Sequence, residues 1–312
     1  MTKLLSVNWE ITKQCNLACT YCRVNAGLPQ KNELTTKQVL SVIDELKRNG
    51  FGHLKFTGGE PLIRKDFWKI VRYAHKNSFK ISLISNGLLI DEKVLDLLAK
   101  YVFVVGISID SIEKETNQIL GRQNYELVMK NIQKLVDKGL RVKILSTITR
   151  VNRKQISDLL LTAKKLGVEE LKINDIVLNG RAADNKLNLA LERPLAESSD
   201  ELAGDVKKIL KEKVEFSKLF KCECNQDNLY IDYRGDLYPC VEMCYDSKDY
   251  CLGNVAKDKL GKLLKINKKF YGQIKNGDHC AYSYMSSPRF SACLNRGGCP
   301  KNLRVYMDNA KK

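Results

Sequence analysis

The sequence predicts an α/β fold, in which a partial (β/α)6 TIM-like barrel is followed by a small cysteine-rich α+β domain with a β-hairpin. Two observations lead to this expectation. Strand-like apolar segments alternate with amphipathic helical segments over residues 6–175, an order typical of a parallel sheet with helices outside it. The eleven cysteines fall into two groups, three before residue 23 and eight after residue 221, which indicates two metal-bearing regions.

The first region should contain six strands connected by helices. The expected strands are residues 6–11, 53–57, 80–85, 101–108, 141–148 and 170–174, and the expected helices are residues 36–49, 65–77, 91–100, 125–138 and 153–166. In the first helix, apolar residues recur at i, i+3, i+4 and i+7 from Val39. Thr35 or Thr36 can cap it and Gly50 ends it. A continuous apolar run such as Val102–Val105 fits a strand buried on both faces.

Changes in composition divide the chain further. We expect a barrel at residues 1–180, a charged helical linker at 181–220 and a second domain at 221–312. In the second domain, Leu229–Tyr233 and Asp236–Tyr238 alternate apolar and polar residues around Arg234-Gly235. This pattern is a hairpin signal.

Composition also bears on location and partners. No apolar run approaches the roughly 20 residues that a membrane span needs, and the first strand leads directly into a cysteine loop rather than a cleaved signal peptide, so we expect a cytoplasmic protein. The net charge of +17 attracts anionic partners such as an acidic peptide, an acidic electron donor or nucleic acid. The lysines are spread along the helices without a nucleic-acid-binding motif, which favours a solvated basic surface and no nucleic acid.

The N-terminal cysteines have the spacing C-x3-C-x2-C, formed by Cys15, Cys19 and Cys22. Three thiolates on one short loop can hold three irons of a [4Fe–4S] cubane, and the missing fourth ligand leaves one iron open to a substrate or cofactor. A disulfide pair and a zinc loop are the alternatives. Zinc takes four tetrahedral ligands, commonly in paired C-x2-C form, so this spacing fits zinc poorly.

With Tyr21 directly before the third cysteine, and an apolar strand before the first, the loop resembles that of the radical SAM superfamily. The resemblance implies that the open iron chelates the amino and carboxylate groups of S-adenosylmethionine. One electron from the cluster would then cleave the sulfonium, and the resulting 5′-deoxyadenosyl radical would abstract a substrate hydrogen. The fold implied by the resemblance is the same partial barrel.

A second motif of the resembled family, GGEP, follows the second expected strand. It comprises Gly58, Gly59, Glu60 and Pro61. A glycine pair alone usually marks a turn, although it also lets the backbone approach a ligand closely. In the resembled family this segment contacts the methionine amino group, and the resemblance implies that Glu60 supports the loop.

Further candidates follow the third and fourth expected strands. Ser108 and Arg122 match the carboxylate-holding pair of the resembled family, and an arginine fork suits a carboxylate; an ordinary surface arginine is the alternative. Asp110 either faces the substrate or caps the following segment. Ser85 and Asn86 either bond the ribose or methionine end or form a plain turn.

Weaker candidates complete this set. Thr147, Thr149 and Asn152, at the end of the fifth expected strand, have the same kind of role as Ser85 and Asn86. Tyr21 either lines the adenine or is a packing residue. Arg181 either holds a substrate carboxylate or is a solvated loop residue.

The second cysteine region resembles the SPASM/twitch extension of radical SAM enzymes, which binds auxiliary iron–sulfur clusters. The candidate ligands are Cys222, Cys224, Cys240, Cys244, Cys280, Cys293 and Cys299. The pattern departs from the family in two places. Cys280 and Cys293 are separated by twelve residues rather than two, and Leu303 stands where the family has a cysteine. Either one auxiliary cluster is bound, or Cys244 and Cys251 complete two sites; zinc is the alternative.

Three functions are consistent with these motifs. The first is radical modification of a ribosomally made peptide by crosslinking, epimerisation or oxidation, in which Cys251 is a spare thiol able to return a hydrogen atom. The second is dehydrogenation or rearrangement of a small molecule. The third is a non-catalytic iron–sulfur scaffold, which leaves the methionine-binding motifs without a use.

The first function implies particular partners. These are a peptide substrate and an acidic electron donor such as a flavodoxin or ferredoxin. The chain begins at its first strand, so we expect a leader peptide either to bind elsewhere, for instance through a separate protein, or to be absent.

Overall fold

The computed structural model describes residues 5–184, 189–191, 228–246, 248–273 and 302–306. The chain divides into two compact units. The first unit comprises residues 1–16, 26–84 and 221–299, and the second comprises residues 17–25, 85–220 and 300–312. Most of the predicted linker at 181–220 lies outside the described residues.

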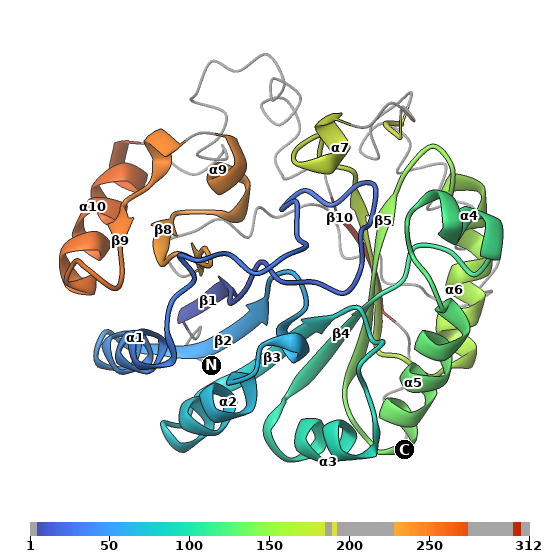
Figure 1. The fold of residues 1–312 in the computed structure, drawn as a ribbon, viewed down its shortest axis with the longest axis horizontal. Coiled ribbons are helices and arrows are strands. Elements are labelled where there is room, and N and C mark those ends of the chain that lie inside the picture. The colour runs from blue at the N-terminus through green and yellow to red at the C-terminus, as the bar shows by residue number, and fades with distance from the viewer. Residues whose placement is uncertain (1–4, 185–188, 192–227, 247, 274–301, 307–312) are drawn as a thin grey trace. The chain divides into compact units, whose positions relative to one another are not determined.

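The first unit contains parallel strands continued by an antiparallel hairpin (Figure 1). Its strands are β1 (Leu5–Glu10), β2 (Phe51–Thr57), β3 (Lys80–Ser85), β7 (Asn228–Ile231), β8 (Asp236–Tyr238) and β9 (Gly253–Asn254). Their order is β3-β2-β1-β7-β8-β9. β1 pairs in parallel with both β2 and β7, whereas β7, β8 and β9 pair antiparallel.

The predicted hairpin is confirmed. Tyr230 of β7 lies opposite Tyr238 of β8, and the turn between the strands contains Gly235 at a φ of 88°. Glycine adopts this left-handed conformation without a steric penalty, which is why the chain reverses at this position.

The second unit contains three parallel strands and one antiparallel strand. They are β4 (Val104–Ser108), β5 (Val142–Ile148), β6 (Glu170–Asp175) and β10 (Asn302–Tyr306). β5 pairs in parallel with β4 and β6, and β10 pairs antiparallel with β6. The sequence did not predict β10, which includes Leu303.

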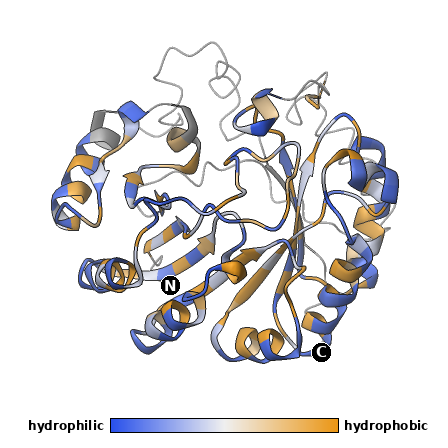
Figure 2. Ribbon diagram, in the orientation of Figure 1, coloured by the Kyte–Doolittle hydropathy of each residue, from blue (hydrophilic) through white to orange (hydrophobic). Residues whose placement is uncertain are grey.

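Amphipathic helices alternate with the strands, as predicted. Those of the described residues are α1 (Thr36–Arg48), α2 (Phe67–Lys76), α3 (Glu92–Tyr101), α4 (Lys114–Ile119), α5 (Tyr125–Asp137), α6 (Ile156–Lys165), α7 (Arg181–Asp184), α9 (Val241–Asp246) and α10 (Leu260–Gln273). Figure 2 shows hydrophilic and hydrophobic positions intermixed along the helices. The sequence did not predict α4, α7, α9 or α10. None of these helices has the length and apolar character required to cross a bilayer.

The first helix illustrates why the elements form where they do. Thr35 is its N-cap, and Thr35 and Gln38 form a capping box. The apolar stripe predicted from Val39 is buried. Gly50 follows the helix at a φ of 83°, which ends it in the conformation that glycine favours.

Three fully buried aromatic rings join β1, β2 and α2 in the core of the first unit. The ring centroids of Trp9 and Phe56 lie 6.2 Å apart, and those of Phe56 and Phe67 lie 5.7 Å apart with an edge-to-face arrangement. Such pairs add to the stability that burial alone gives. This cluster fixes β1, whose end leads into the cysteine loop.

We predict that Phe67→Ala lowers the free energy of unfolding by about 3–5 kcal/mol, because it leaves a cavity among fully buried rings. Urea unfolding of the iron-free protein, followed by circular dichroism, measures the loss. Phe103→Ala is the matched control, because Phe103 is 41% exposed and its truncation leaves no comparable cavity. An equal loss in the two variants would contradict the prediction.

Candidate active site

Part of the cysteine loop is held through its main chain. The Cys22 N–H donates to the Cys19 carbonyl at 3.2 Å, and the Asn25 N–H donates to the Cys22 carbonyl at 3.1 Å. Arg181 donates to the same two carbonyls, from its Nε to Cys19 at 2.7 Å and from its backbone N–H to Cys22 at 3.0 Å. On the side of the cysteine loop, all of these bonds are made by N–H and carbonyl groups of its main chain, and none uses a thiol.

Cys15 belongs to the first unit, where its N–H donates to the Gly27 carbonyl at 2.8 Å. The side chains of Cys15, Cys19 and Cys22 are partly exposed, and none of the three is disulfide-bonded. The structure therefore gives no support to a disulfide in this loop. Unbridged, partly exposed thiols have the donor chemistry that an iron–sulfur cluster needs.

A buried carboxylate lies just beyond the end of β4. Asp110 is 2% exposed. Its Oδ2 accepts a hydrogen bond from the Tyr21 hydroxyl and lies 2.5 Å from Nε of Arg122, while its Oδ1 accepts from the Thr147 N–H at 2.6 Å. Asp110 thereby connects the cysteine loop to the ends of β4 and β5. The sequence offered a substrate contact or a cap for Asp110; a substrate contact stays a prediction.

Asn152 supports the ends of β4 and β5 around Asp110. The sequence noted this residue but did not predict the bonds of its side chain. Its Nδ2 donates to the carbonyls of Asp110 at 2.8 Å and Thr147 at 2.9 Å. Its Oδ1 accepts from the Thr149 N–H at 2.7 Å and the Thr149 hydroxyl at 2.9 Å. Because Asn152 is completely buried, these four bonds fix the ends of β4 and β5 against each other.

The side chain of Arg122 is 13% exposed and is oriented by three partners. Besides Asp110, its Nε donates to the Tyr21 hydroxyl at 2.5 Å, and its Nη1 donates to the Ser108 carbonyl at 2.9 Å. Within the described residues, Nη2 has no hydrogen-bond partner. Ser108 and Arg122, predicted as a pair, are thus brought together through the Ser108 main chain.

The electrostatics of this arrangement keep Arg122 charged. Burial by itself would lower the pKa of Arg122, but the charge of Asp110 and the hydrogen bond to Tyr21 raise it, and the resulting pKa is well above the usual value. Burial also raises the pKa of the Tyr21 hydroxyl well above its usual value. Tyr21 therefore remains a neutral donor to Asp110.

The ring of Tyr21 packs into a small apolar cluster of the second unit. Its neighbours there are Leu120, Ala182 and Leu189, with Cys19 partly buried against them. This is the packing environment that the sequence offered as the alternative to an adenine contact. The adenine contact itself stays a prediction.

The GGEP segment lies directly against the first half of the cysteine loop. The N–H of Gly59 donates to the Thr12 carbonyl and that of Glu60 to the Gln14 carbonyl, each at 2.7 Å. A Cβ at Gly58 would lie 2.5 Å from the Thr12 carbonyl oxygen, and one at Gly59 would lie 2.1 Å from that of Gln14. No residue with a side chain fits at either position, so the two glycines are required by backbone contact alone.

Glu60 has the supporting role that the resemblance implied. It is completely buried, and its Oε1 accepts a hydrogen bond from the Leu62 N–H at 3.1 Å, capping the short 3-10 turn at Pro61–Ile63. The carboxylate thus shapes the loop that carries the glycine pair.

Ser85 and Asn86 form the turn that was one of their two predicted roles. The Ser85 hydroxyl accepts from the Gly87 N–H, and the Asn86 side-chain oxygen accepts from the Leu88 N–H, each at 3.0 Å. Asn131 of α5 donates to the Gly87 carbonyl at 2.9 Å. The turn is therefore fixed from within and from the neighbouring helix.

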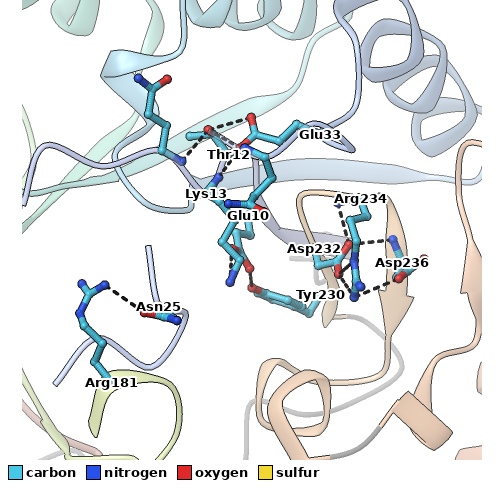
Figure 3. A network of polar contacts seen from close by, with 12 residues as sticks. Glu10, Thr12, Lys13, Asn25, Glu33, Arg181, Tyr230, Asp232, Arg234 and Asp236 are labelled. Carbon is cyan, nitrogen blue, oxygen red and sulfur yellow. Dashed lines mark hydrogen bonds and ion pairs between the residues drawn. The ribbon is translucent and has the colours of Figure 1, made fainter. Parts of the chain in front are cut away.

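Glu33 and Arg64, which the sequence did not single out, anchor the chain before Cys15. The Glu33 carboxylate accepts from the Thr12 hydroxyl at 2.9 Å and from the Lys13 N–H at 2.8 Å (Figure 3). Arg64 donates to the Ile11 carbonyl at 2.7 Å. No spacing rule identifies such contacts, because each joins a side chain to a distant backbone group.

A second polar network stiffens the hairpin of the first unit (Figure 3). The Tyr230 hydroxyl donates to Glu10 at 2.6 Å, which links β7 to β1. Asp232 accepts from the N–H groups of Arg234 at 2.8 Å and Asp236 at 3.0 Å, and it also binds the Arg234 guanidinium. The network holds the turn that separates the two strands.

The second cysteine region is described only in part. Cys240 is buried, and Cys244 and Cys251 are partly buried. Burial raises the pKa of both Cys244 and Cys251. The other predicted ligands lie outside the described residues: Cys222, Cys224, Cys280, Cys293 and Cys299. In the part of the chain that is described, no three acidic, cysteine or histidine side chains are grouped as ligands of one metal ion, so the ligand sets stay predictions.

Two family models match the chain. The model of the radical SAM superfamily matches residues 9–178, which is more than half of the 312 residues. The model of an iron–sulfur cluster-binding domain, SPASM, matches residues 222–295.

Some curated relatives match almost the whole of this chain, and others match about half of it. Mycofactocin maturase MftC of Mycobacterium tuberculosis is 29% identical over 313 residues, 95% of this chain and 78% of the relative. The subtilosin biosynthesis protein AlbA of Bacillus subtilis is 24% identical over 95% of this chain and 65% of its own. An S-adenosylmethionine-dependent nucleotide dehydratase of Selenomonas ruminantium is 36% identical, but over only 54% of this chain and 64% of its own.

Solved structures resemble this one over almost its full length. SuiB of Streptococcus suis bound to S-adenosylmethionine has a TM-score of 0.71 at 17% identity, covering 95% of this chain and 73% of its own. The enzyme anSMEcpe with bound AdoMet has a TM-score of 0.66 at 20% identity, covering 94% and 88%. Both proteins have also been solved with a peptide. These likenesses confirm the predicted fold of a partial barrel with a C-terminal hairpin region.

We predict that Asp110→Asn lowers the free energy of unfolding by about 3–5 kcal/mol, because it leaves the buried charge of Arg122 without its counter-ion. Urea unfolding of the iron-free protein measures the loss. Asp96→Asn is the matched control, since Asp96 is 69% exposed and pairs with Lys138 at the surface; this variant should unfold like wild type. A small loss at Asp110 would mean that the ion pair is not the constraint described above.

Proposed function

Because this chain belongs to the radical SAM superfamily, we propose that it removes a hydrogen atom from a peptide and so matures a ribosomally made peptide by crosslinking, epimerisation or oxidation. The chain is a radical SAM enzyme with a C-terminal iron–sulfur domain. One observation carries the choice of a peptide: the likeness to SuiB, solved with a precursor peptide, spans 96% of this chain.

The cofactors are a [4Fe–4S] cluster with S-adenosylmethionine and auxiliary iron–sulfur clusters in the C-terminal domain. Together they supply the one-electron chemistry by which a hydrogen atom is removed. We assign Cys15, Cys19 and Cys22 as ligands of the first cluster, because their thiols are unbridged and partly exposed.

The methionine end of S-adenosylmethionine is assigned to two groups of residues. The turn of Gly58, Gly59 and Glu60 receives its amino group, as the family resemblance implies; the glycines hold this turn against the Thr12 and Gln14 carbonyls. Arg122, supported by Ser108, receives its carboxylate. The donor is Nη2, because the other guanidinium nitrogens are bound to Asp110, Tyr21 and the Ser108 carbonyl.

The remaining predicted contacts stay part of the proposal. Tyr21 and Asp110 act by orienting Arg122. Ser85, Asn86 and Thr147 lie at the ends of β3 and β5, where the ends of barrel strands form sites.

The auxiliary clusters are assigned to the second cysteine region. The proposed ligands are Cys222, Cys224, Cys240, Cys244, Cys280, Cys293 and Cys299. Cys251 is proposed to return a hydrogen atom to the substrate. Its Sγ lies 3.5 Å from the Gly253 carbonyl, and its raised pKa keeps the S–H bond that this step uses.

We also propose partners for electron and substrate delivery. The net charge of +17 favours encounter with an acidic electron donor such as a flavodoxin or ferredoxin. A separate protein is proposed to bind the leader of the peptide.

A small-molecule substrate is the second candidate. One observation favours it: the nucleotide dehydratase is 36% identical to this chain, compared with 29% for MftC and 24% for AlbA. That match covers only 54% of this chain, so almost half of the chain is not part of it.

We predict that the reduced, reconstituted enzyme cleaves S-adenosylmethionine, and that Cys15→Ala/Cys19→Ala/Cys22→Ala abolishes cleavage and removes about four irons per chain. Iron and sulfide assays, with chromatographic detection of 5′-deoxyadenosine, measure both. Candidate precursor peptides are then compared with small alcohols and nucleotides by mass spectrometry. Products from small molecules alone would overturn the peptide proposal, and a triple variant that kept all its iron would overturn the ligand assignment.

The role of Cys251 has its own test. We predict that Cys251→Ala retains the wild-type iron content and cleaves S-adenosylmethionine, but no longer incorporates deuterium from D2O into the peptide. Cys251→Ser, which fills the same space without an S–H bond, is the control and should behave alike. Normal deuterium incorporation in both variants would exclude hydrogen return, and a loss of iron would make Cys251 a cluster ligand instead.

A further inference from the structure

The segment that follows β6 reaches back to the cysteine loop over more than 150 residues of sequence. Arg181 makes three bonds to that loop: its Nε to the Cys19 carbonyl at 2.7 Å, its backbone N–H to the Cys22 carbonyl at 3.0 Å, and its Nη1 to the Asn25 side chain at 3.1 Å. The last of these is drawn in Figure 3. All four residues belong to the second unit.

The preceding residue makes this approach possible. Gly180 has a φ of 56°, and a Cβ there would lie 2.6 Å from the carbonyl oxygens of both Cys22 and Arg23. Any side chain would therefore push the two segments apart. Gly180 allows the two backbones to approach each other, and this approach brings Arg181 within hydrogen-bonding distance of the Cys19 and Cys22 carbonyls.

Apolar packing holds the same segment in place. Ala182, next along the chain, is buried against Tyr21, Leu120 and Leu189. The backbone of Arg181 is thus fixed from one side by packing and from the other by the loop. The sequence offered a solvated loop position and a substrate carboxylate as roles for Arg181; the contacts with the cysteine loop were not among them.

The donor of the bond to the Cys19 carbonyl is a charged guanidinium. A guanidinium donates to the carbonyl of a residue whose thiol is assigned to the first cluster, and hydrogen bonds to charged donors are about twice as strong as neutral ones. Positive charge and hydrogen bonding around a cluster raise its reduction potential. Arg181 therefore acts on both the position of the ligands and the ease with which the cluster accepts an electron.

We propose that Arg181 is a positioning residue for the S-adenosylmethionine-binding cluster: it fixes Cys19 and Cys22 through their carbonyl groups and raises the reduction potential of the cluster they hold. The proposal rests on the cluster assigned above but is independent of the substrate. It requires only one-electron reduction of the cluster by an added reductant.

The test uses the full chain, reconstituted anaerobically, as wild type, Arg181→Gln and Arg181→Lys. Arg141→Gln is the matched control: it removes the same charge from the same unit, but Arg141 bonds to Glu169 and not to the loop. Potentiometric titration with dithionite and mediators, followed by electron paramagnetic resonance, gives each midpoint potential. The signal that changes on adding S-adenosylmethionine identifies the cluster in question.

We expect Arg181→Gln to keep its iron and to lower the ratio of reduced to oxidised cluster about tenfold at a fixed reductant potential, as loss of one partly screened charge should. For a one-electron couple this equals about 59 mV. Arg181→Lys should recover most of the shift, and Arg141→Gln should match wild type. A wild-type potential in Arg181→Gln, or an equal shift in Arg141→Gln, would overturn the proposal.

Failure of Arg181→Gln to bind iron is also informative. Thermal unfolding of the iron-free proteins then distinguishes a role of Arg181 in holding the ligands from a role in folding. An unfolding temperature equal to that of wild type supports a role in holding the ligands, whereas a clearly lower one assigns Arg181 to folding and overturns the proposal. If no peptide is modified but the potentials follow the expected order, the peptide proposal fails and this one stands.

Discussion

The buried carboxylate of Asp110 is the constraint on which the second unit depends. A charge with 2% exposure is tolerated only when it is paired and hydrogen-bonded. Here the pairing is complete, since Arg122, Tyr21 and the Thr147 N–H all bind the two oxygens. Because these partners come from the cysteine loop, from the segment after α4 and from β5, one charge determines how three parts of the chain meet.

Close backbone contact is the second means by which the loop is held. Gly58 and Gly59 bring the GGEP segment against Thr12 and Gln14 in the first unit. In the second unit, Gly121 lies so near the Ala18 carbonyl that a Cβ would be 2.7 Å from its oxygen. Contacts of this kind use carbonyl and N–H groups, and so they leave the thiols of the loop to act as ligands.

The sequence predicted the fold well because the fold follows from local patterns. The stripe from Val39 gave α1, and the alternation around Gly235 gave the β7–β8 hairpin. The Asp110–Arg122 pair and the Arg181 contact were not predicted, although all three residues had been noticed. A periodicity identifies which face of an element is buried, but it carries no information on which distant backbone carbonyl a side chain will reach.

The two arginines of the second unit perform different tasks for the same loop. Burial raises the pKa of the Cys19 thiol, whereas the charges of Arg122 and Arg181 both act to lower it. Of the two charges, that of Arg122 lowers the pKa of Cys19 more, and the charge of Asp110, which lies 2.5 Å from Arg122, acts in the opposite sense. Arg181 differs from Arg122 in bonding directly to the main chain of the loop, at the carbonyls of Cys19 and Cys22. Because those bonds fix the backbone of two cluster cysteines, Arg181 acts on the loop first through its geometry, whereas Arg122 is held away from the loop backbone by Asp110 and Ser108.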